Sequence, residues 1–297
     1  MVLGSEPYFS AKFRTDLNWQ TQTRAVRAAL EQHSLLVTSQ LPALLVAEEA
    51  GLFPDLHIAH NVDTVLAESH DPKLFRLLGN ASRMEQLERR VLAQPRYLAA
   101  LSTRDVARLK DWRLDASHWP LGVAGQIQLR KSGRIGFLGK GSWPPNIAAV
   151  EFLIDEVMPL VRPRLGSRTP QVVIAGRETS KWSGRPGVEV VGEVESAEEF
   201  YRSVDMVAVP RMGEATGVSV KMLEARACGV PVIVPPELAR DAGLTDGYLS
   251  AKSTDETVDR IVEFYSGCAE AEDTYTPNAP YQEVPAEILR KLVESND

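Results

Sequence analysis

Short apolar segments alternate with helical segments along most of the chain, and this alternation limits the fold more than any other feature. "LLVTS" from Leu35, "LHIAH" from Leu56 and "YLAALS" from Tyr97 are separated by stretches such as "RMEQLERRVLAQ" from Arg83, where apolar residues recur at spacings of three and four. Strands separated by helices of this length form parallel sheets that are covered by helices. The pattern therefore predicts a βαβ repeat. Within it, "STRD" from Ser102 offers an N-cap with an acid three positions on, and "VARLKDW" then continues as a helix.

The same alternation begins again after the polar segment "QLRKSG". "RIGFLG" from Arg134 is followed by a predicted helix over about Asn146–Leu165, and the strands "QVVIAG", "VEVVGEV", "DMVAVP" and "VPVIVP" then alternate with further helices. We place a boundary near Lys131 and predict an α/β protein of two Rossmann-like domains, residues 1–130 and 131–297. Each domain has a parallel sheet with helices on both faces, and ligands of such folds bind at the carboxyl ends of the strands.

The composition narrows the classes of function. The chain has 297 residues, which suffices for two domains, and its net charge of −7 argues against a nucleic-acid partner, because binding to phosphates depends on clustered Lys and Arg. Two cysteines, Cys228 and Cys268, are too few for a disulfide framework or a zinc cluster. The apolar run from Leu35 is interrupted by Pro42 and polar residues, and the first residues do not form a signal peptide. We expect a cytoplasmic protein.

One stretch, "GVSVKMLEARACGVPVIVP" from Gly217, has the features of an anion site. Thr216 is a candidate N-cap, and the backbone amides of Gly217 and Val218 would then point out of the start of a helix. Helix N-termini bind anions such as a diphosphate, and Arg211 or Lys221 would add full positive charge.

The carboxylate of Glu224 follows in the same helix. It lies about two turns beyond Gly217 and could accept hydrogen bonds from the hydroxyls of a ribose. The alternative is that Lys221 and Glu224 are only a solvated pair on an amphipathic helix. The stretch by itself supports both interpretations.

A second candidate phosphate contact is Lys140, in "RIGFLGKGSWPPN". The strand ends in Gly139-Lys140-Gly141, where little side-chain bulk surrounds the lysine. A Walker A motif is excluded, because Gly141 stands where Ser or Thr would hold magnesium and Arg134 where the first glycine belongs. Pro144 rules out a dinucleotide fingerprint, which weakens the case for hydride transfer. The alternative for Lys140 is an ordinary turn lysine.

These segments resemble the group 1 (family 4) glycosyltransferases of the two-Rossmann-domain GT-B fold. The similarity runs from about Arg134 to Tyr265, and Gly217, Lys221 and Glu224 match the family pattern residue by residue. The resemblance implies that Glu224 is the ribose-binding member of a Glu-x7-Glu pair. It also implies that backbone amides beside it hold the diphosphate of a nucleotide sugar.

The same resemblance assigns further positions and shows two departures. Lys140 corresponds to the family's basic residues after the first strand of the donor domain, and Val194, in the turn "GEV", to the segment whose backbone reads the nucleobase. Thr216 stands where the first glutamate of the Glu-x7-Glu pair is expected, and Glu214 is offset by two residues. The usual contact with the donor sugar is therefore in question.

In the first half, His60 and Asn61 end the strand "LHIAH" and resemble an "HN" strand end of the family. The resemblance implies that His60 lies where acceptor and donor sugar meet, whereas a structural role is the alternative; His57 is out of phase on the same strand. Nothing before "NWQTQTRAVRAALEQ" resembles the family's first strand and Gly-rich loop. We expect a first domain without its usual first strand, whose uncovered sheet edge a partner chain could complete.

The resemblance implies transfer of a sugar from a nucleotide diphosphate sugar, as co-substrate, to a glycan, a glycolipid or another hydroxyl acceptor. It implies a retaining, metal-independent reaction without a cofactor, and the chain contains no Asp-x-Asp motif. Weak peripheral association with a membrane stays open. Two alternatives remain: a nucleotide-sugar-binding regulatory subunit without catalytic activity, and an epimerase of the same fold that alters the donor sugar.

Overall fold

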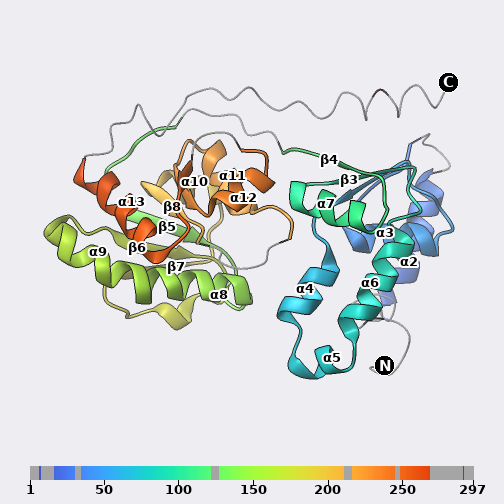
Figure 1. The fold of residues 1–297 in the computed structure, drawn as a ribbon, viewed down its shortest axis with the longest axis horizontal. Coiled ribbons are helices and arrows are strands. Elements are labelled where there is room, and N and C mark those ends of the chain that lie inside the picture. Colours follow the sequence, from blue (N-terminus) through green and yellow to red (C-terminus); the bar gives the residue numbers. More distant parts are fainter. Residues whose placement is uncertain are drawn as a thin grey trace. The chain divides into compact units, whose positions relative to one another are not determined.

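The chain forms two compact units (Figure 1). A computed structural model describes residues 7, 17–30, 35–121, 127–210, 216–244, 248–267 and 290. The first unit comprises the described residues up to Leu121 together with residues 216–218. The described residues from 127 to 210 and from 219 to 267 form the second unit. Residues 127–130, assigned to the first domain from the sequence, thus belong to the second unit.

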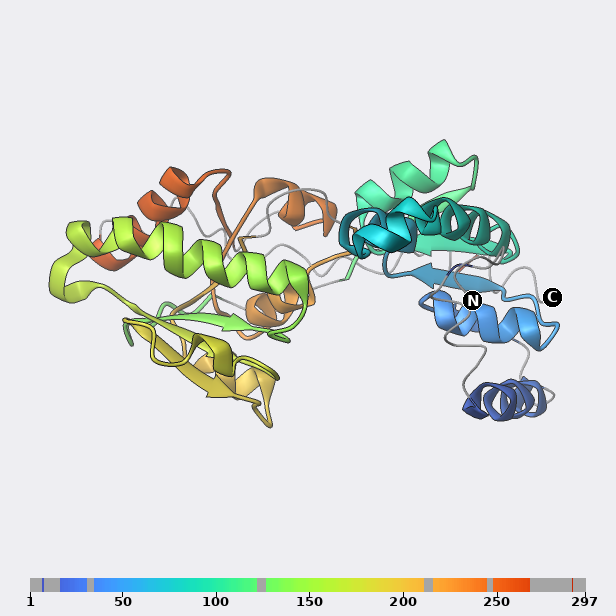
Figure 2. The same cartoon turned by 90° about the horizontal axis from the view of Figure 1, so that it is seen from below.

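The first unit is built on a parallel sheet of four strands in the order β1-β2-β3-β4. The strands are β1 (Val37–Ser39), β2 (Leu56–Ala59), β3 (Tyr97–Ala100) and β4 (Ala116–His118). The helices are α2 (Leu17–Leu30), α3 (Leu41–Glu49), α4 (Asp63–His70), α5 (Lys73–Leu77), α6 (Asn80–Val91) and α7 (Thr103–Asp111). Figure 2 shows α2 and α3 on one side of this sheet and α4, α6 and α7 on the other. The predicted βαβ repeat with helices on both faces is confirmed.

Local signals fix the helices of this unit. Ser102 caps α7, since its hydroxyl accepts the N–H of Asp105 at 3.4 Å, as the "STRD" motif predicts. The apolar stripe of α6 carries Met84, Leu87 and Val91 into the core. Among the described residues before Val37, the chain forms the helix α2; the absence of the family's first strand stays a prediction.

The second unit is built on a six-stranded parallel sheet in the order β10-β9-β8-β5-β6-β7. Its strands are β5 (Arg134–Leu138), β6 (Gln171–Ala175), β7 (Val188–Gly192), β8 (Met206–Ala208), β9 (Val232–Val234) and β10 (Tyr248–Ser250). Its α-helices are α8 (Pro144–Glu151), α9 (Met158–Leu165), α10 (Ala197–Arg202), α11 (Val220–Ala227), α12 (Pro236–Asp241) and α13 (Thr254–Ser266). The order reverses beside β5, so the loops after β5 and β8 border a topological switch point, where sheets of this kind bind ligands.

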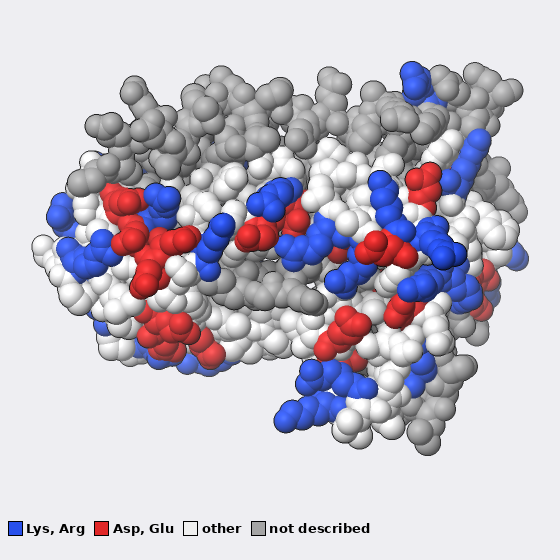
Figure 3. Space-filling view, viewed as in Figure 1, with Lys and Arg blue, Asp and Glu red and all other residues white. Residues whose placement is uncertain are grey.

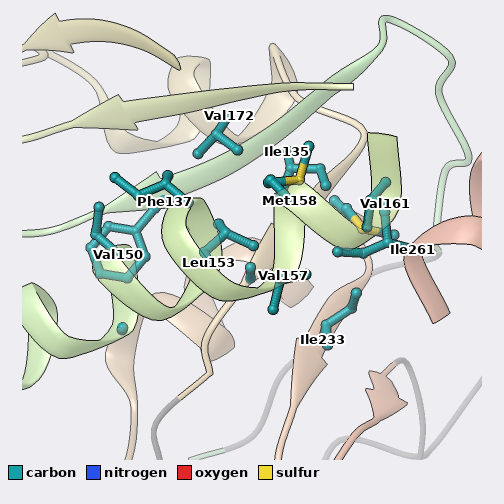
Figure 4. Packing of buried hydrophobic residues seen from close by; sticks show 14 of the residues in the cluster. Ile135, Phe137, Val150, Leu153, Val157, Met158, Val161, Val172, Ile233 and Ile261 are labelled. Carbon is teal, nitrogen blue, oxygen red and sulfur yellow. The ribbon is translucent and has the colours of Figure 1, made fainter. Parts of the chain in front are cut away.

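A helical stretch packs along one face of the second sheet. It corresponds to the helix predicted over Asn146–Leu165 and consists of α8, a π-helical turn (Phe152–Val157) and α9. Figure 4 shows Val150 of this stretch beside Phe137 of β5, in a cluster that also contains Leu153 and Val157. The π turn ends just before Pro159, which has no N–H to bond the preceding turn. This packing holds the carboxyl end of β5 in place.

Asp205, at the start of β8, ties the amino end of β5 to the rest of the second unit. Its carboxylate accepts the backbone N–H groups of Ser132, Gly133 and Arg134 at 2.6, 2.7 and 3.0 Å and the hydroxyl of Tyr265 at 3.1 Å. Burial opposes ionisation, but these hydrogen bonds hold the pKa of Asp205 below its ordinary value. A charged Asp205 therefore anchors β5 from behind the candidate site.

Candidate functional site

Lys221 connects the first turn of α11 with the loop after β5. Its ammonium group donates a hydrogen bond to Oδ1 of Asn146 at 2.7 Å and lies 4.6 Å from the ring centroid of Phe137. The amide of Asn146 in turn donates to the carbonyl of Lys140 at 2.9 Å. The predicted site residues Lys140 and Lys221 are thus linked through one buried asparagine at the switch point.

The loop around Lys140 needs its two glycines for close packing. A Cβ atom on Gly139 would lie 2.6 Å from the side-chain amide of Asn146, and one on Gly141 would lie 2.0 Å from the carbonyl oxygen of Glu178. The ammonium group of Lys140 lies 3.2 Å from the carboxylate of Glu178, and both side chains are about half exposed. Lys140 is accordingly a surface lysine with a carboxylate partner. Its contact with a phosphate stays a prediction.

Glu224 presents an exposed carboxylate that a buried tyrosine holds in place. The hydroxyl of Tyr201 on α10 donates to Oε2 of Glu224 at 2.8 Å, while Tyr201 itself is 0% exposed. Burial, and then the charge of Glu224, raise the pKa of this phenol above its ordinary value, so it remains a donor. The sequence singled out Glu224 but not Tyr201. A buried tyrosine one helix earlier carries no local signal of this contact.

The start of α11 differs from the prediction. The helix begins at Val220 with Ser219 as its N-cap residue, so Thr216 is not the cap. The N–H of Gly217 donates to Oδ2 of Asp105 at 2.6 Å, so the expected free amide at Gly217 is wrong. Thr216 and Gly217 belong with Asp105 to the first unit. For Val218, also in that unit, the predicted contact with a diphosphate stays a prediction.

Thr216 is 2% exposed, and its hydroxyl is used within the first unit. It donates to Oδ1 of Asp105 at 2.9 Å and accepts the N–H of Val62 at 2.6 Å. Gly217 has a positive φ of 68°, and a Cβ there would lie 2.3 Å from both the carbonyl oxygen of His60 and Oδ1 of Asn61. These contacts bring together four residues that were singled out from the sequence in two distant segments: His60, Asn61, Thr216 and Gly217.

His60 is partly exposed just after β2, whereas His57 is fully buried in that strand. Nε2 of His60 lies 2.7 Å from the hydroxyl of Ser39, and Nδ1 of His57 lies 2.9 Å from the hydroxyl of Thr38. Burial lowers the pKa of His60, and burial followed by repulsion from His60 lowers the pKa of His57 to about 4. Both imidazoles are therefore neutral near pH 7.

Buried carboxylates form a group that sequence reasoning missed. Glu88 is 1% exposed, and its carboxylate accepts the N–H groups of Asp63 and Thr64, each at 2.7 Å, at the start of α4. Burial, and then the nearby Asp63, raise the pKa of Glu88 to about 8. A signal was available, because Glu88 occupies the apolar stripe of α6 four residues after Met84.

The remaining predictions concern Val194, Arg211 and a metal. Val194 is partly exposed two residues after β7, at the carboxyl edge of the second sheet, and its contact with a nucleobase stays a prediction. Arg211 lies outside the described residues. In the parts of the chain described above, no three His, Cys, Asp or Glu side chains group as a metal site would require. Nor does any helix there have the length and apolar character needed to cross a bilayer.

Basic and acidic side chains are interspersed on the face of the molecule seen in Figure 3, in both units.

Comparisons with known proteins show which family the second unit resembles. Residues 132–266 match the model of the family described as glycosyl transferases group 1. Over these residues the chain is similar to the group 1 glycosyl transferases. The resemblance stated from the sequence is confirmed over nearly the same residues, Arg134 to Tyr265. A comparison with curated proteins gave no match.

Several solved structures share the two-domain GT-B fold. Sucrose-phosphate synthase from Thermosynechococcus elongatus is 14% identical with a TM-score of 0.57, over 95% of this chain and 78% of that one. HepE of Anabaena, in complex with UDP-glucose, is 11% identical with a TM-score of 0.52, over 92% and 81%. The pneumococcal O-GlcNAc transferase GtfA, in complex with UDP and GlcNAc, is 14% identical with a TM-score of 0.52, over 91% and 56%. The predicted fold of two Rossmann-like domains is confirmed.

Proposed function

We propose that the protein transfers a sugar from a nucleoside diphosphate sugar to a hydroxyl group of an acceptor. The observation that carries this proposal is the exposed carboxylate of Glu224, which the hydroxyl of Tyr201 holds in place. Glu224 lies one helical turn after Lys221, at the switch point of the unit that matches the group 1 glycosyl transferases. A carboxylate and an ammonium group on one helix face suit a ribose and a diphosphate, which carry hydroxyls and negative charge respectively.

Each predicted site residue except Gly217, whose N–H is bound by Asp105, has a role in this proposal. Glu224 accepts hydrogen bonds from the ribose, the backbone near Val194 contacts the base, and Lys221, Lys140 and Arg211 neutralise the diphosphate, with help from the amide of Val218. Electrostatic stabilisation of the departing diphosphate supplies much of the rate, without a metal or a cofactor. The anomeric configuration is retained, and the acceptor is a glycan or a lipid-linked hydroxyl that meets the donor sugar at His60.

UDP is the first nucleotide to test, because crystal structures of HepE and GtfA contain it. A thermal-shift screen of nucleoside diphosphates and their sugars is expected to show one base that raises the melting temperature. A ligand at a hundred times its Kd adds about 2.7 kcal/mol of stability. Incubation of the stabilising nucleotide sugar with hydroxyl acceptors and with water then tests for transfer and hydrolysis.

The assignment of Glu224 has its own control. Glu224→Gln is expected to weaken nucleoside diphosphate binding in calorimetry by about ten- to a hundredfold, because a charge-assisted hydrogen bond is lost. Glu151→Gln, an exposed glutamate at the end of α8, is the matched control and leaves binding unchanged. Equal affinities of the Glu224 variant and the unmodified protein would remove Glu224 from the site.

One observation favours a second candidate, a nucleotide-sugar-binding subunit that does not catalyse transfer. Thr216 stands where the resemblance expects a sugar-binding glutamate, and it is buried with its hydroxyl already hydrogen-bonded. Binding of a nucleotide sugar without transfer to any acceptor and without hydrolysis would support this candidate over the first.

A further inference from the structure

The carboxyl ends of β1 and β2 bring a serine hydroxyl and an imidazole together at the edge of the first sheet. Ser39 is the last residue of β1, and its hydroxyl oxygen lies 2.7 Å from Nε2 of His60. The side-chain amide nitrogen of the next residue, Gln40, lies 3.4 Å from Nδ1 of the same ring. Two consecutive residues thus contact both nitrogens of His60.

The backbone of the turn explains this arrangement. Ser39 pairs in register with Ile58 of β2, and the N–H of Gln40 donates to the carbonyl of Ile58 at 3.1 Å. Gln40 then adopts a positive φ of 68°, which few residues other than glycine do, before α3 begins at Leu41. Retaining a bulky side chain in this conformation costs stability, and such strain is often found at functional sites.

The contacts define a preferred tautomer for His60. An amide N–H of Gln40 that points at Nδ1 makes this nitrogen an acceptor, so the proton of the neutral ring is on Nε2 and is donated to Ser39. The contact with Gln40 is long, whereas the contact with Ser39 is short. A substrate hydroxyl can therefore replace Gln40 at Nδ1 while Ser39 keeps its hold on Nε2.

The electrostatic surroundings agree with a neutral ring. Burial lowers the pKa of His60, and His57 on the same strand is neutral as well, since burial and repulsion from His60 lower its pKa to about 4. Asp63, at the start of α4, is the nearest acidic residue along the chain, and burial followed by repulsion from Asp105 raises its pKa to about 6.

We propose that Ser39 and Gln40 are positioning residues for the His60 imidazole: the amide of Gln40 keeps Nδ1 an acceptor and so favours the Nε2-protonated tautomer, and Ser39 holds the ring through Nε2, so that Nδ1 is offered to a substrate hydroxyl. This inference rests on the proposed glycosyl transfer for the role of His60 but not for the state of its ring. Sugars and their acceptors carry hydroxyl donors, so an imidazole fixed in this way accepts one hydrogen bond in a defined direction.

The state of the ring is tested by NMR on protein labelled with 15N-histidine. The chain has five histidines, and loss of one signal set in His60→Gln assigns the residue. Near neutral pH the unmodified protein is expected to show the chemical shifts of a single Nε2-protonated tautomer. Gln40→Met, which removes the amide donor, should shift them toward the average of both tautomers. Ser39→Ala should change the Nε2 shift because its hydrogen bond is lost, whereas Ser39→Thr, which keeps the hydroxyl, should not. Unchanged shifts in Gln40→Met or in Ser39→Ala, or an Nδ1-protonated ring in the unmodified protein, would overturn the proposal.

The role of the ring is tested by kinetics with the nucleotide sugar that the screen identifies. Ser39→Ala is expected to lower kcat about three- to tenfold with KM for the donor changed less than about twofold, and Ser39→Thr should recover most of the rate. Ser117→Ala, an exposed serine in β4 of the same sheet, is the control. Equal losses in the alanine and threonine variants contradict the role of the hydroxyl. If no nucleotide sugar is turned over, the proposed function fails, while the NMR experiment still decides the role of Ser39.

Discussion

The carboxylate of Asp105 accepts hydrogen bonds from two consecutive residues, Thr216 and Gly217. Oδ1 accepts the Thr216 hydroxyl at 2.9 Å, and Oδ2 accepts the Gly217 N–H at 2.6 Å, with Asp105 only 2% exposed. Asp105 lies in the first turn of α7, so the helix that Ser102 caps also fixes a segment that lies 111 residues further along the chain. Two predictions follow from this contact.

Gly217→Ala is expected to destabilise the first unit by about 2–4 kcal/mol. The residue has a positive φ of 68°, and its new Cβ would lie 2.3 Å from the backbone oxygen of His60, so both strain and a clash are introduced. Urea unfolding followed by fluorescence measures the loss. Gly267→Ala is the matched control, because Gly267 has a φ of 76° with nothing within 4 Å, and it should cost only about 1 kcal/mol. Equal losses would show that the contact with His60 is unimportant.

Thr216→Val is expected to destabilise the same unit by about 1–3 kcal/mol. The substitution keeps the shape of the side chain but leaves the N–H of Val62 without its acceptor and removes the hydroxyl that donates to Oδ1 of Asp105. Thr216→Ser, which keeps the hydroxyl, should lose less. Hydrogen exchange at the amide of Val62 reports the effect directly, and unchanged protection in the valine variant would contradict it.

The alternation of apolar and helical segments was sufficient to predict both parallel sheets, because strands that are joined through a helix run in the same direction within one sheet. The same holds for the cap at Ser102 and for the helix after β5, whose signals lie within a few residues. The predicted cap at Thr216 was wrong because the preference of threonine for N-caps competes with a distant partner, Asp105. Local sequence does not encode that partner.

The candidate site likewise contains residues that the sequence reveals and contacts that it does not. Glu224 and Lys221 were found from their spacing on one helix, whereas the contacts that orient them come from Tyr201 and Asn146, 23 and 75 residues away. Such partners depend on how strands stack in the sheet, and no periodicity reveals them. Glu88 is different, since a glutamate in the apolar stripe of α6 already indicates a buried carboxylate with hydrogen-bond partners.

Tyr201→Phe is expected to weaken nucleoside diphosphate binding about two- to tenfold. The phenol holds Oε2 of Glu224, and without it the exposed carboxylate samples more rotamers before it can bind a ribose. Calorimetry measures the change in Kd. Tyr265→Phe is the matched control, because Tyr265 also donates to a carboxylate, that of Asp205, but at the opposite end of β5. That variant should lose stability and keep its affinity; weakened binding in both variants would point to a general loss of structure.

Glu88 is expected to make the first unit less stable as the pH rises from about 5 to 8. Burial, and then Asp63, raise its pKa from the ordinary 4.5 to about 8, so between these values the folded state binds a proton that the unfolded state has released. Stability is then fully present below the unfolded pKa and is lost as the pH approaches the folded one, by at most about 1.4 kcal/mol per pH unit for one group. The pKa of Asp63, raised to about 6, acts in the same direction at lower pH.

Glu88→Gln removes the titration, so the urea midpoint of this variant should vary less with pH across this window, although the variant is less stable where the carboxylate was a better acceptor. Glu85→Gln, on the same helix and paired with Arg89, provides the control and should keep the slope of the unmodified protein. A slope that is identical in all three proteins would show that Glu88 titrates at its ordinary pKa despite its burial, and that its hydrogen bonds to the start of α4 outweigh the cost of removing its charge from water.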